Sequence, residues 1–295
     1  MTEPLASWEL ARGDSLADDL VAMRLLGGGN AYEAYLCFDE VLHSPVVVKV
    51  VRPDQVDDEV TLRGLAREAQ MLDELAHPAV VRKFGLDLDG PRPYLILENI
   101  DGPRLSSLVR KHGVLPVQQL LPLGLELASA LHYLRVRDVV HLDVKPSNVI
   151  MGSPAKLIDL SIARRTDDAR ALTYVVGTDD YLAPEQADPQ GYGVVGPASD
   201  VWGLGATLYL ATCGYTPYEV GDASDPLEVR YPQLVSRPRP MPYFVPVEVA
   251  ELVYRCMAPN PDDRPEPAEV ARMIEPLMEA MPKARLSGFK ISATA

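Results

Sequence analysis

The spacing of apolar residues along the chain changes near residue 100. Before that point, short apolar runs rich in β-branched residues alternate with turns, and they predict strands at 21–26, 32–38, 46–51, 80–88 and 94–98. One segment, 59–75, has apolar residues at helical spacing instead, and His77-Pro78 ends it. We therefore expect the first hundred residues to form a five-stranded antiparallel sheet with one helix.

Helical spacing predominates after residue 100. It predicts helices at 105–111, 116–137, 201–212, 246–257 and 267–281, with a short one at 185–186. The segment 160–183 lacks a period and is typical of a long functional loop. The expected fold class is α+β, with a small antiparallel β-sheet lobe at 21–98 and a larger, mainly helical lobe at 99–282. We expect a leader at 1–20, in which a short strand or turn is left open, and a C-terminal tail at 283–295.

The composition and net charge of the chain limit which kinds of molecule it is expected to bind. The chain has 295 residues with 47 % hydrophobic ones, and 42 acidic against 28 basic residues give a formal net charge of -14. This charge disfavours nucleic acid or an anionic membrane as a partner, since both need clustered positive charge. Three separated cysteines offer no disulfide framework. No apolar run approaches the ~20 residues of a membrane span, and no secretory signal is present, so we expect a soluble, cytoplasmic protein.

Candidate chemistry is concentrated in the segment 141–148, His-Leu-Asp-Val-Lys-Pro-Ser-Asn, and in an acid that follows it, Asp159. Asp143 can accept a proton from an alcohol, and Lys145 can neutralise a phosphoryl group in transfer. Asn148 and Asp159 offer the hard oxygen ligands that suit Mg²⁺. The group is therefore suited to holding a hydroxyl, a phosphoryl group and a metal ion together.

These segments resemble known motifs of protein kinases. The first is similar to the catalytic loop H-R-D-x-x-x-x-N, and Asp159 lies where the family carries D-F-G. With a glycine-rich turn, a strand lysine and a helix glutamate in the same order, the chain resembles bacterial eukaryotic-type (Hanks-type) serine/threonine kinases from about residue 21 to 281, as a soluble stand-alone catalytic domain. The resemblance implies the two-lobe kinase fold, and ATP with Mg²⁺, or alternatively Mn²⁺, as cofactors.

The segment 26–34 aligns with the family's glycine-rich loop, G-x-G-x-x-G-x-V. Gly27 and Gly29 match its first two glycines, Gly28 lies between them, and Tyr32 departs from the third. Glycines allow backbone amides to approach phosphates closely. The resemblance therefore assigns this turn to nucleotide phosphates.

Lys49 lies in an apolar strand, where the family's lysine holds the α and β phosphates. A buried lysine needs a carboxylate partner. Glu68 on the predicted helix is the favoured candidate, and Glu59 and Glu74 are the alternatives.

The resemblance also implies an adenine pocket. The family usually has valine at the position of Ala34 and alanine at the position of Val47. The swap conserves the total side-chain volume of the two positions. The implied pocket has Ala34 and Val47 above the ring, Ile150 below it, Leu97 behind it and the backbone of Glu98 and Ile100 at its edge.

Two departures concern the activation segment. Leu142 replaces the arginine of H-R-D, which pairs with a phosphorylated residue in the family, so we expect activity to depend less on phosphorylation there. Ser161 replaces the glycine of D-F-G but removes no metal ligand. Autophosphorylation sites remain available at Thr166, Thr173, Tyr174 and Thr178.

Further matches imply contacts within the helical lobe. Thr178 matches the threonine that bridges the catalytic aspartate and lysine in serine/threonine kinases, and Lys145 indicates the same specificity. The resemblance also implies that Glu185 pairs with Arg264, and that Asp200 is bound to the catalytic loop.

The favoured hypothesis is an active serine/threonine protein kinase with a role in signalling, in which Asp143, Lys145, Lys49, Glu68 and Thr178 form the catalytic set. The alternative is a pseudokinase or nucleotide-binding interaction module, which Tyr32, Leu142 and Ser161 motivate. A small-molecule phosphotransferase is a third reading, against which Glu185 and Arg264 argue. Expected partners are ATP and protein substrates, and a homodimer stays open.

Overall fold

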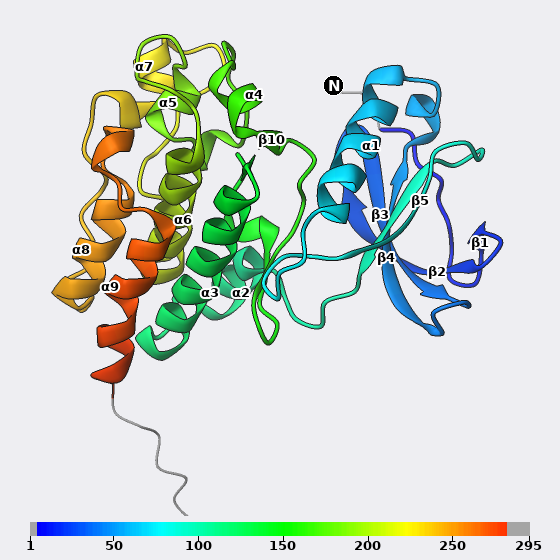
Figure 1. Cartoon of the computed structure of the whole chain (residues 1–295), viewed down its shortest axis with the longest axis horizontal. Coiled ribbons are helices and arrows are strands. Elements are labelled where there is room, and N and C mark those ends of the chain that lie inside the picture. The colour runs from blue at the N-terminus through cyan, green and yellow to red at the C-terminus, as the bar shows by residue number, and fades with distance from the viewer. Residues whose placement is uncertain (1–4, 282–295) are drawn as a thin grey trace, which may run out of the picture.

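The computed structural model describes residues 5–281, which form a sheet lobe and a helical lobe (Figure 1). The first four residues of the predicted leader and the predicted tail at 283–295 lie outside the described residues. The two-lobe α+β architecture agrees with the predicted fold class. The exact domain boundaries, at residues 20 and 98, stay predictions.

The sheet has six strands rather than five, in the order β1-β2-β3-β4-β6-β5. Its strands are β1 (Ser15–Ala17), β2 (Leu20–Gly28), β3 (Tyr32–Asp39), β4 (Ser44–Val51), β5 (Lys83–Asp87) and β6 (Tyr94–Glu98). The prediction of five strands was wrong because β1 lies in the segment that was assigned to a leader. Ser15 pairs with Val21 across an antiparallel ladder, and three residues are too few to show an alternating pattern.

The helix of the sheet lobe, α1 (Glu59–Asp73), begins where predicted. The side chain of Asp58 accepts a hydrogen bond from the backbone N–H of Thr61 and caps its N-terminus. One face of α1 is buried against the sheet and carries Leu65, Glu68, Ala69 and Leu72. A glutamate on this apolar face needs an internal partner.

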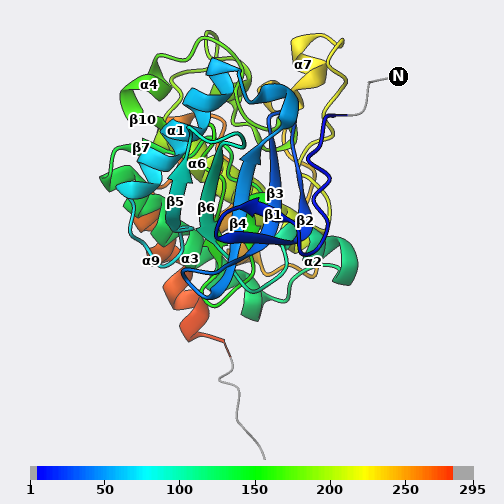
Figure 2. The ribbon, with the colours of Figure 1, turned by 90° about the vertical axis from the view of Figure 1, so that its right-hand side faces the viewer.

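The helical lobe holds the remaining helices (Figures 1 and 2). They are α2 (Leu105–His112), α3 (Val117–Val136), α4 (Thr166–Arg170), α5 (Pro184–Ala187), α6 (Pro197–Cys213), α7 (Leu227–Arg230), α8 (Val247–Cys256) and α9 (Pro267–Glu279). Helix α3 packs against α6 and α9. Helix α6 begins earlier than predicted, because its first turn, Pro-Ala-Ser-Asp, falls outside the apolar run.

Four short two-residue strands lie between residues 139 and 165. They are β7 (Val139–Val140), β8 (Val149–Ile150), β9 (Lys156–Leu157) and β10 (Arg164–Arg165). The pairs β7–β10 and β8–β9 are antiparallel. Strands β7 and β9 contact α3, which ties this segment to the helical lobe. The predicted loop at 160–183 thus contains β10 and α4. Within residues 5–281, no helix combines the length and the apolar character that a bilayer span requires.

Candidate active site

Helix α6 holds the catalytic loop, residues 141–148, through hydrogen bonds. Asp200 on that helix accepts the backbone N–H groups of His141 at 2.7 Å and of Leu142 at 2.8 Å. Leu142 has a φ of 67°, a left-handed conformation that is costly for a leucine. The two hydrogen bonds hold this turn, and they confirm the predicted link between Asp200 and the loop. Burial raises the pKa of Asp200 to about 6.

Asp143, Lys145 and Thr178 form one connected cluster. The Lys145 ammonium lies 2.7 Å from Asp143 Oδ2 and donates to the Thr178 hydroxyl at 2.6 Å. That hydroxyl donates to Asp143 Oδ1 at 2.7 Å. The predicted bridge is therefore present in the structure. It orients a carboxylate that is only 11 % exposed beside an ammonium group, which is an arrangement able to bind and deprotonate an alcohol.

Asn148 supports the same carboxylate and leaves an oxygen for a cation. Its Nδ2 donates to the backbone carbonyl of Asp143 and to Asp143 Oδ2, both at 3.0 Å. The Asn148 Oδ1 is the remaining polar atom of that side chain. Amide and carboxylate oxygens are hard ligands, so the donor type suits a divalent cation such as Mg²⁺.

Asp159 supplies the second candidate metal ligand. Its φ of 66° is left-handed, which aspartate tolerates better than most residues. Its Oδ1 accepts hydrogen bonds from Lys49 at 3.1 Å and from the Ser161 backbone N–H at 3.4 Å. The side chain remains 39 % exposed. Burial alone would raise the pKa of Asp159, but Lys49 outweighs it and holds that pKa well below its usual value.

The strand lysine pairs with the favoured glutamate. Lys49 Nζ lies 2.7 Å from Glu68 Oε2, and Glu68 is 1 % exposed. Burial alone would lower the pKa of Lys49, but the carboxylates of Glu68 and Asp159 raise it above its ordinary value. The two alternatives are bound elsewhere, Glu59 to Arg63 and Glu74 to Arg165. The prediction that Glu68 is the partner of Lys49 is confirmed.

Tyr32 turns away from the glycine-rich turn and contacts α1, which sequence reasoning missed. Its hydroxyl donates to the backbone carbonyl of Thr61 at 2.8 Å, and the Lys49 ammonium lies 4.8 Å from the centroid of its ring. A Cβ at Gly64 would lie 3.0 Å from the Tyr32 hydroxyl. The glycine within a helix was the available signal, because such a glycine indicates close packing.

The glycine-rich turn connects β2 and β3, with Gly27 opposite Ala34 and Gly28 opposite Glu33. Gly27 has a φ of 135°, which side chains rarely adopt. A Cβ at Gly28 would lie 2.5 Å from the Tyr32 carbonyl, whereas one at Gly29 would meet nothing within 4 Å. The turn is therefore tight at Gly28 and open at Gly29.

Most of the predicted adenine-contacting residues lie on the adjacent strands β3, β4 and β6, whereas Ile150 lies on β8 and Ile100 follows β6. Val47 on β4 is opposite Leu97 on β6, and Ala34 on β3 is opposite Lys49 on β4. Leu97 is buried, and Ile150 on β8 is half-buried. The side chain of Glu98 is held by Lys156 at 2.7 Å and by Arg82 at 3.1 Å. Ile100 follows and packs against the core. The structure gives these positions, and their role toward adenine stays a prediction.

Leu142 packs within a small apolar cluster instead of facing solvent. The cluster joins the catalytic loop to the activation segment and contains Val140, Leu142, Ala169, Leu172 and Val195, with Ile162 and Val176 packed against it. The side chain of Gln186 adds hydrogen bonds to the carbonyls of Leu142 and Val176. The activation segment is thus held by apolar packing at the place where the family uses a charged pair.

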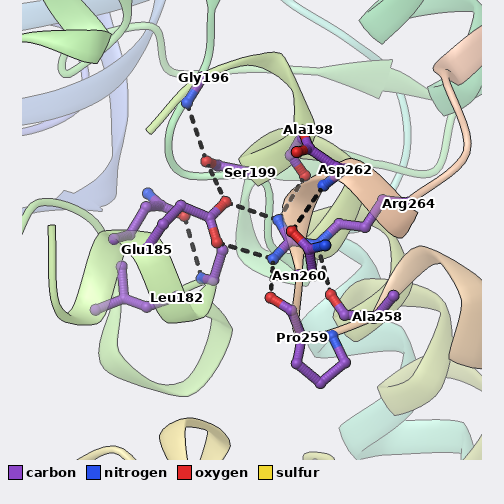
Figure 3. Close-up of polar contacts among 12 residues, drawn as sticks. Leu182, Glu185, Gly196, Ala198, Ser199, Ala258, Pro259, Asn260, Asp262 and Arg264 are labelled. Carbon is purple, nitrogen blue, oxygen red and sulfur yellow. Dashed lines mark hydrogen bonds and ion pairs between the residues drawn. The ribbon is translucent and has the colours of Figure 1, made fainter. Parts of the chain in front are cut away.

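The predicted pair of Glu185 and Arg264 is present and fully buried (Figure 3). Arg264 donates to both carboxylate oxygens, at 2.7 and 2.8 Å. Its remaining N–H groups reach the backbone carbonyls of Ala258, Pro259 and Ala198. A buried pair whose other donors are satisfied fixes the loop after Thr178 to the helical lobe.

Comparison with known proteins agrees with this geometry. Residues 20–274 match the protein kinase domain family. The chain is 33 % identical over 260 residues to the serine/threonine-protein kinase PknB of Mycobacterium leprae, which covers 84 % of this chain and 41 % of the relative. It is 32 % identical over 270 residues to PknB of Mycolicibacterium smegmatis, covering 87 % and 42 %.

A third relative is the serine/threonine-protein kinase PkaA of Streptomyces coelicolor, with 34 % identity over 246 residues, 80 % of this chain and 44 % of the relative. The chain thus spans less than half the length of these relatives. The match to the family covers both lobes and every residue of the cluster around Asp143. The chain belongs to the protein kinase domain family, and its relatives are bacterial serine/threonine kinases.

Proposed function

We propose that this protein is an active serine/threonine protein kinase that transfers the γ-phosphate of ATP to protein hydroxyls, its own included. The observation that carries the proposal is the connected cluster of Asp143, Lys145 and Thr178. Such a cluster is costly to maintain unless the oriented carboxylate is used, because three polar side chains are held together in a poorly hydrated place.

The geometry supports the following roles. Asp143 orients the substrate hydroxyl and accepts its proton, while Lys145 stabilises the negative charge that develops on the phosphoryl group. Lys49, held by Glu68, would contact the nucleotide phosphates. When bound, ATP with a divalent ion supplies the phosphoryl group and further positive charge. The protein contributes mainly position and fixed charge.

The nucleotide and metal contacts belong to the same proposal. Asn148 and Asp159 would hold Mg²⁺, or Mn²⁺ in its place. The turn at Gly27, Gly28 and Gly29 would cover the phosphates. The adenine ring would occupy the place formed by Ala34, Val47, Leu97 and Ile150, with the backbone of Glu98 and Ile100 at its edge.

The three departures that motivated the pseudokinase reading leave the contacts among Asp143, Lys145 and Thr178 in place. Tyr32 is directed to α1, and Leu142 packs in the apolar cluster. The Ser161 N–H supports Asp159. These contacts support the reading as an active enzyme over that of a nucleotide-binding module. The protein substrate and a homodimer are matters for experiment, and the cytoplasmic location stays a prediction.

Intact mass after incubation with ATP and Mg²⁺ tests the proposal. Wild type should gain whole phosphates, and it should phosphorylate a generic basic protein substrate. Asp143→Asn should do neither while binding ATP with nearly the wild-type affinity. Nucleotide binding without phosphate transfer by the wild type, to itself or to the added protein, would contradict the proposal.

A further inference from the structure

A short segment near the N-terminus is tied to the nucleotide-binding turn through two buried charged side chains. The segment consists of Ala6, Ser7 and Trp8, and we name it the strap. The buried side chains are Glu33 on β3, 1 % exposed, and Arg52 after β4, 7 % exposed. Neither has a part in the proposed chemistry. A buried carboxylate and guanidinium are retained at a cost unless each is fully hydrogen-bonded.

The strap supplies two of the four hydrogen bonds that Glu33 receives. The Ser7 hydroxyl donates to Glu33 Oε1 at 2.6 Å, and the Trp8 backbone N–H donates to Oε2 at 3.0 Å. Arg52 donates a second hydrogen bond to Glu33 Oε1 at 3.3 Å. The Tyr35 hydroxyl donates a second one to Glu33 Oε2 at 3.4 Å. Each oxygen thus has two donors, and one donor to each comes from the strap.

Arg52 links the strap to the turn that would cover the phosphates. Its Nη1 donates to the Ala6 carbonyl at 2.6 Å, and its Nε donates to the Gly29 carbonyl at 2.6 Å. Its backbone N–H donates to the Ala31 carbonyl at 3.0 Å. A Cβ at Gly28 would lie 3.0 Å from Arg52 Nη2. One guanidinium therefore contacts both segments, and the turn is packed directly on it.

Trp8 fastens the strap beside that link. Its indole N–H donates to the carbonyl of Val51, the residue before Arg52, at 2.7 Å. The guanidinium of Arg92 lies 4.8 Å from the centroid of the Trp8 ring. The strap is thus hydrogen-bonded to the backbone next to Arg52, and its tryptophan ring also contacts Arg92.

We propose that the strap is a positioning element for the nucleotide. By completing the hydrogen bonds of Glu33 and Arg52, it holds the Gly29 carbonyl and with it the turn in a closed form before ATP arrives. Release of the strap removes two donors from a buried carboxylate. Because an unsatisfied buried carboxylate is costly, we expect the Arg52 guanidinium to shift toward Glu33 and its bond to the Gly29 carbonyl to weaken. The inference rests on the proposed function, because it assigns the turn to ATP.

The test uses the whole chain and measures affinity, not only activity. In the double variant Ser7→Ala, Trp8→Phe, the strap loses its hydroxyl and indole donors and keeps an aromatic ring against Arg92. We expect the Kd for ATP with Mg²⁺, measured by calorimetry, to rise about fivefold, since the variant loses the charge-assisted bond from Ser7 to Glu33 and the neutral bond from the Trp8 indole to the Val51 carbonyl. The KM for ATP should rise equally, and kcat should stay within about twofold.

Two further variants make the result specific. Arg52→Lys keeps the charge but cannot bridge Ala6 and Gly29 with a planar fork, so it should raise the Kd similarly. Ser15→Ala is the matched control, because within residues 5–281 the Ser15 hydroxyl bonds only to the nearby Ala17 carbonyl, and it should leave the Kd unchanged.

Coupling between two sites is reciprocal, which adds a second readout. Saturation of the wild type with ATP should slow hydrogen exchange at the amide of Trp8 about fivefold. A double variant that loses thermal stability but keeps the wild-type Kd, with exchange at Trp8 indifferent to ATP, would show that the strap only stabilises the fold and would overturn the inference. A wild type that does not bind ATP would overturn the proposed function as well.

Discussion

The ring of Tyr32 lies against the ammonium of Lys49, with 4.8 Å between Nζ and the ring centroid, while its hydroxyl binds the Thr61 carbonyl of α1. The tyrosine thus joins the strand that carries Lys49 to the helix that carries Glu68. A residue at a glycine position of the family motif therefore supports the ion pair that the family requires.

Removal of this contact should lower catalytic efficiency. We expect Tyr32→Ala to reduce kcat/KM about tenfold, because a desolvated cation–π contact contributes about 1–2 kcal/mol and a hydrogen bond is lost with it. Tyr32→Phe keeps the ring and should lose about threefold. Steady-state kinetics measures both, with the fully exposed Tyr243→Ala as the control. Equal activity of Tyr32→Ala and wild type would refute the role.

Gly64 should be coupled energetically to Tyr32. An alanine in a helix interior usually stabilises by about 1 kcal/mol over glycine. Here the added methyl would lie 3.0 Å from the tyrosine hydroxyl, so Gly64→Ala should yield little in the wild type and the full gain in a Tyr32→Phe background. Urea unfolding of the four proteins gives the coupling energy. Additive effects would show that the two side chains do not meet.

Thr178 should act through its hydroxyl. Thr178→Val preserves the shape but leaves Asp143 and Lys145 without their bridge, and we expect kcat to fall about 10- to 100-fold, since a hydrogen bond to a charged group contributes about 1.5–3 kcal/mol. Thr178→Ser restores the hydroxyl and should keep most of the activity. Single-turnover kinetics checks this, and similar rates for the valine and serine variants would count against the bridge.

Activity should not need a phosphate on the activation segment. Apolar packing of Leu142 with Leu172 holds the segment, so Thr173→Ala and phosphatase-treated wild type should keep at least about half of the activity. Leu172→Ala opens a cavity in that cluster and should cost about 2–4 kcal/mol of local or global stability. Peptide phosphorylation and hydrogen exchange measure the two effects. Full dependence on phosphate would contradict the packing argument.

The buried pair of Arg264 and Glu185 should be intolerant of change. Arg264→Lys cannot bind both carboxylate oxygens, and we expect it to lower the free energy of unfolding by about 3–5 kcal/mol, because charge is left buried and poorly paired. Urea denaturation measures this. Arg255→Lys, at a largely exposed pair with Glu269, is the matched control and should cost less than about 1 kcal/mol.

The charges of Lys49 and Asp159 should not titrate near neutral pH. Lys49 has a raised pKa, so its stabilisation is complete below about pH 10 and is lost only above that. Asp159 has a lowered pKa, so its stabilisation is complete above about pH 4 and is lost as the pH falls further. The carboxyl ¹³C shift of Asp159, assigned with Asp159→Asn, should therefore be constant from pH 5 to 9. A titration step in that interval would show that the Lys49 contact is weaker than the structure indicates.

Local sequence patterns determined much of the secondary structure and the position of the candidate catalytic residues. The apolar spacing of α1 and its Asp58 cap are readable from neighbouring residues, as is the alternation of β6. The order of Asp143, Lys145, Asn148 and Asp159 also placed the candidate chemistry, because these side chains come from one short stretch whose spacing is itself the signal.

Tertiary structure decided which distant groups meet. Lys49 had three candidate partners, and only the packing of α1 buries Glu68 against it while Glu59 and Glu74 bind arginines elsewhere. Tertiary structure also decided that Tyr32 contacts α1, that β1 pairs at the edge of the sheet, and that Arg52 lies between the strap and Gly29. Helical and strand periods are set by neighbours along the chain, but burial depends on how whole elements pack, and no local pattern carries that information.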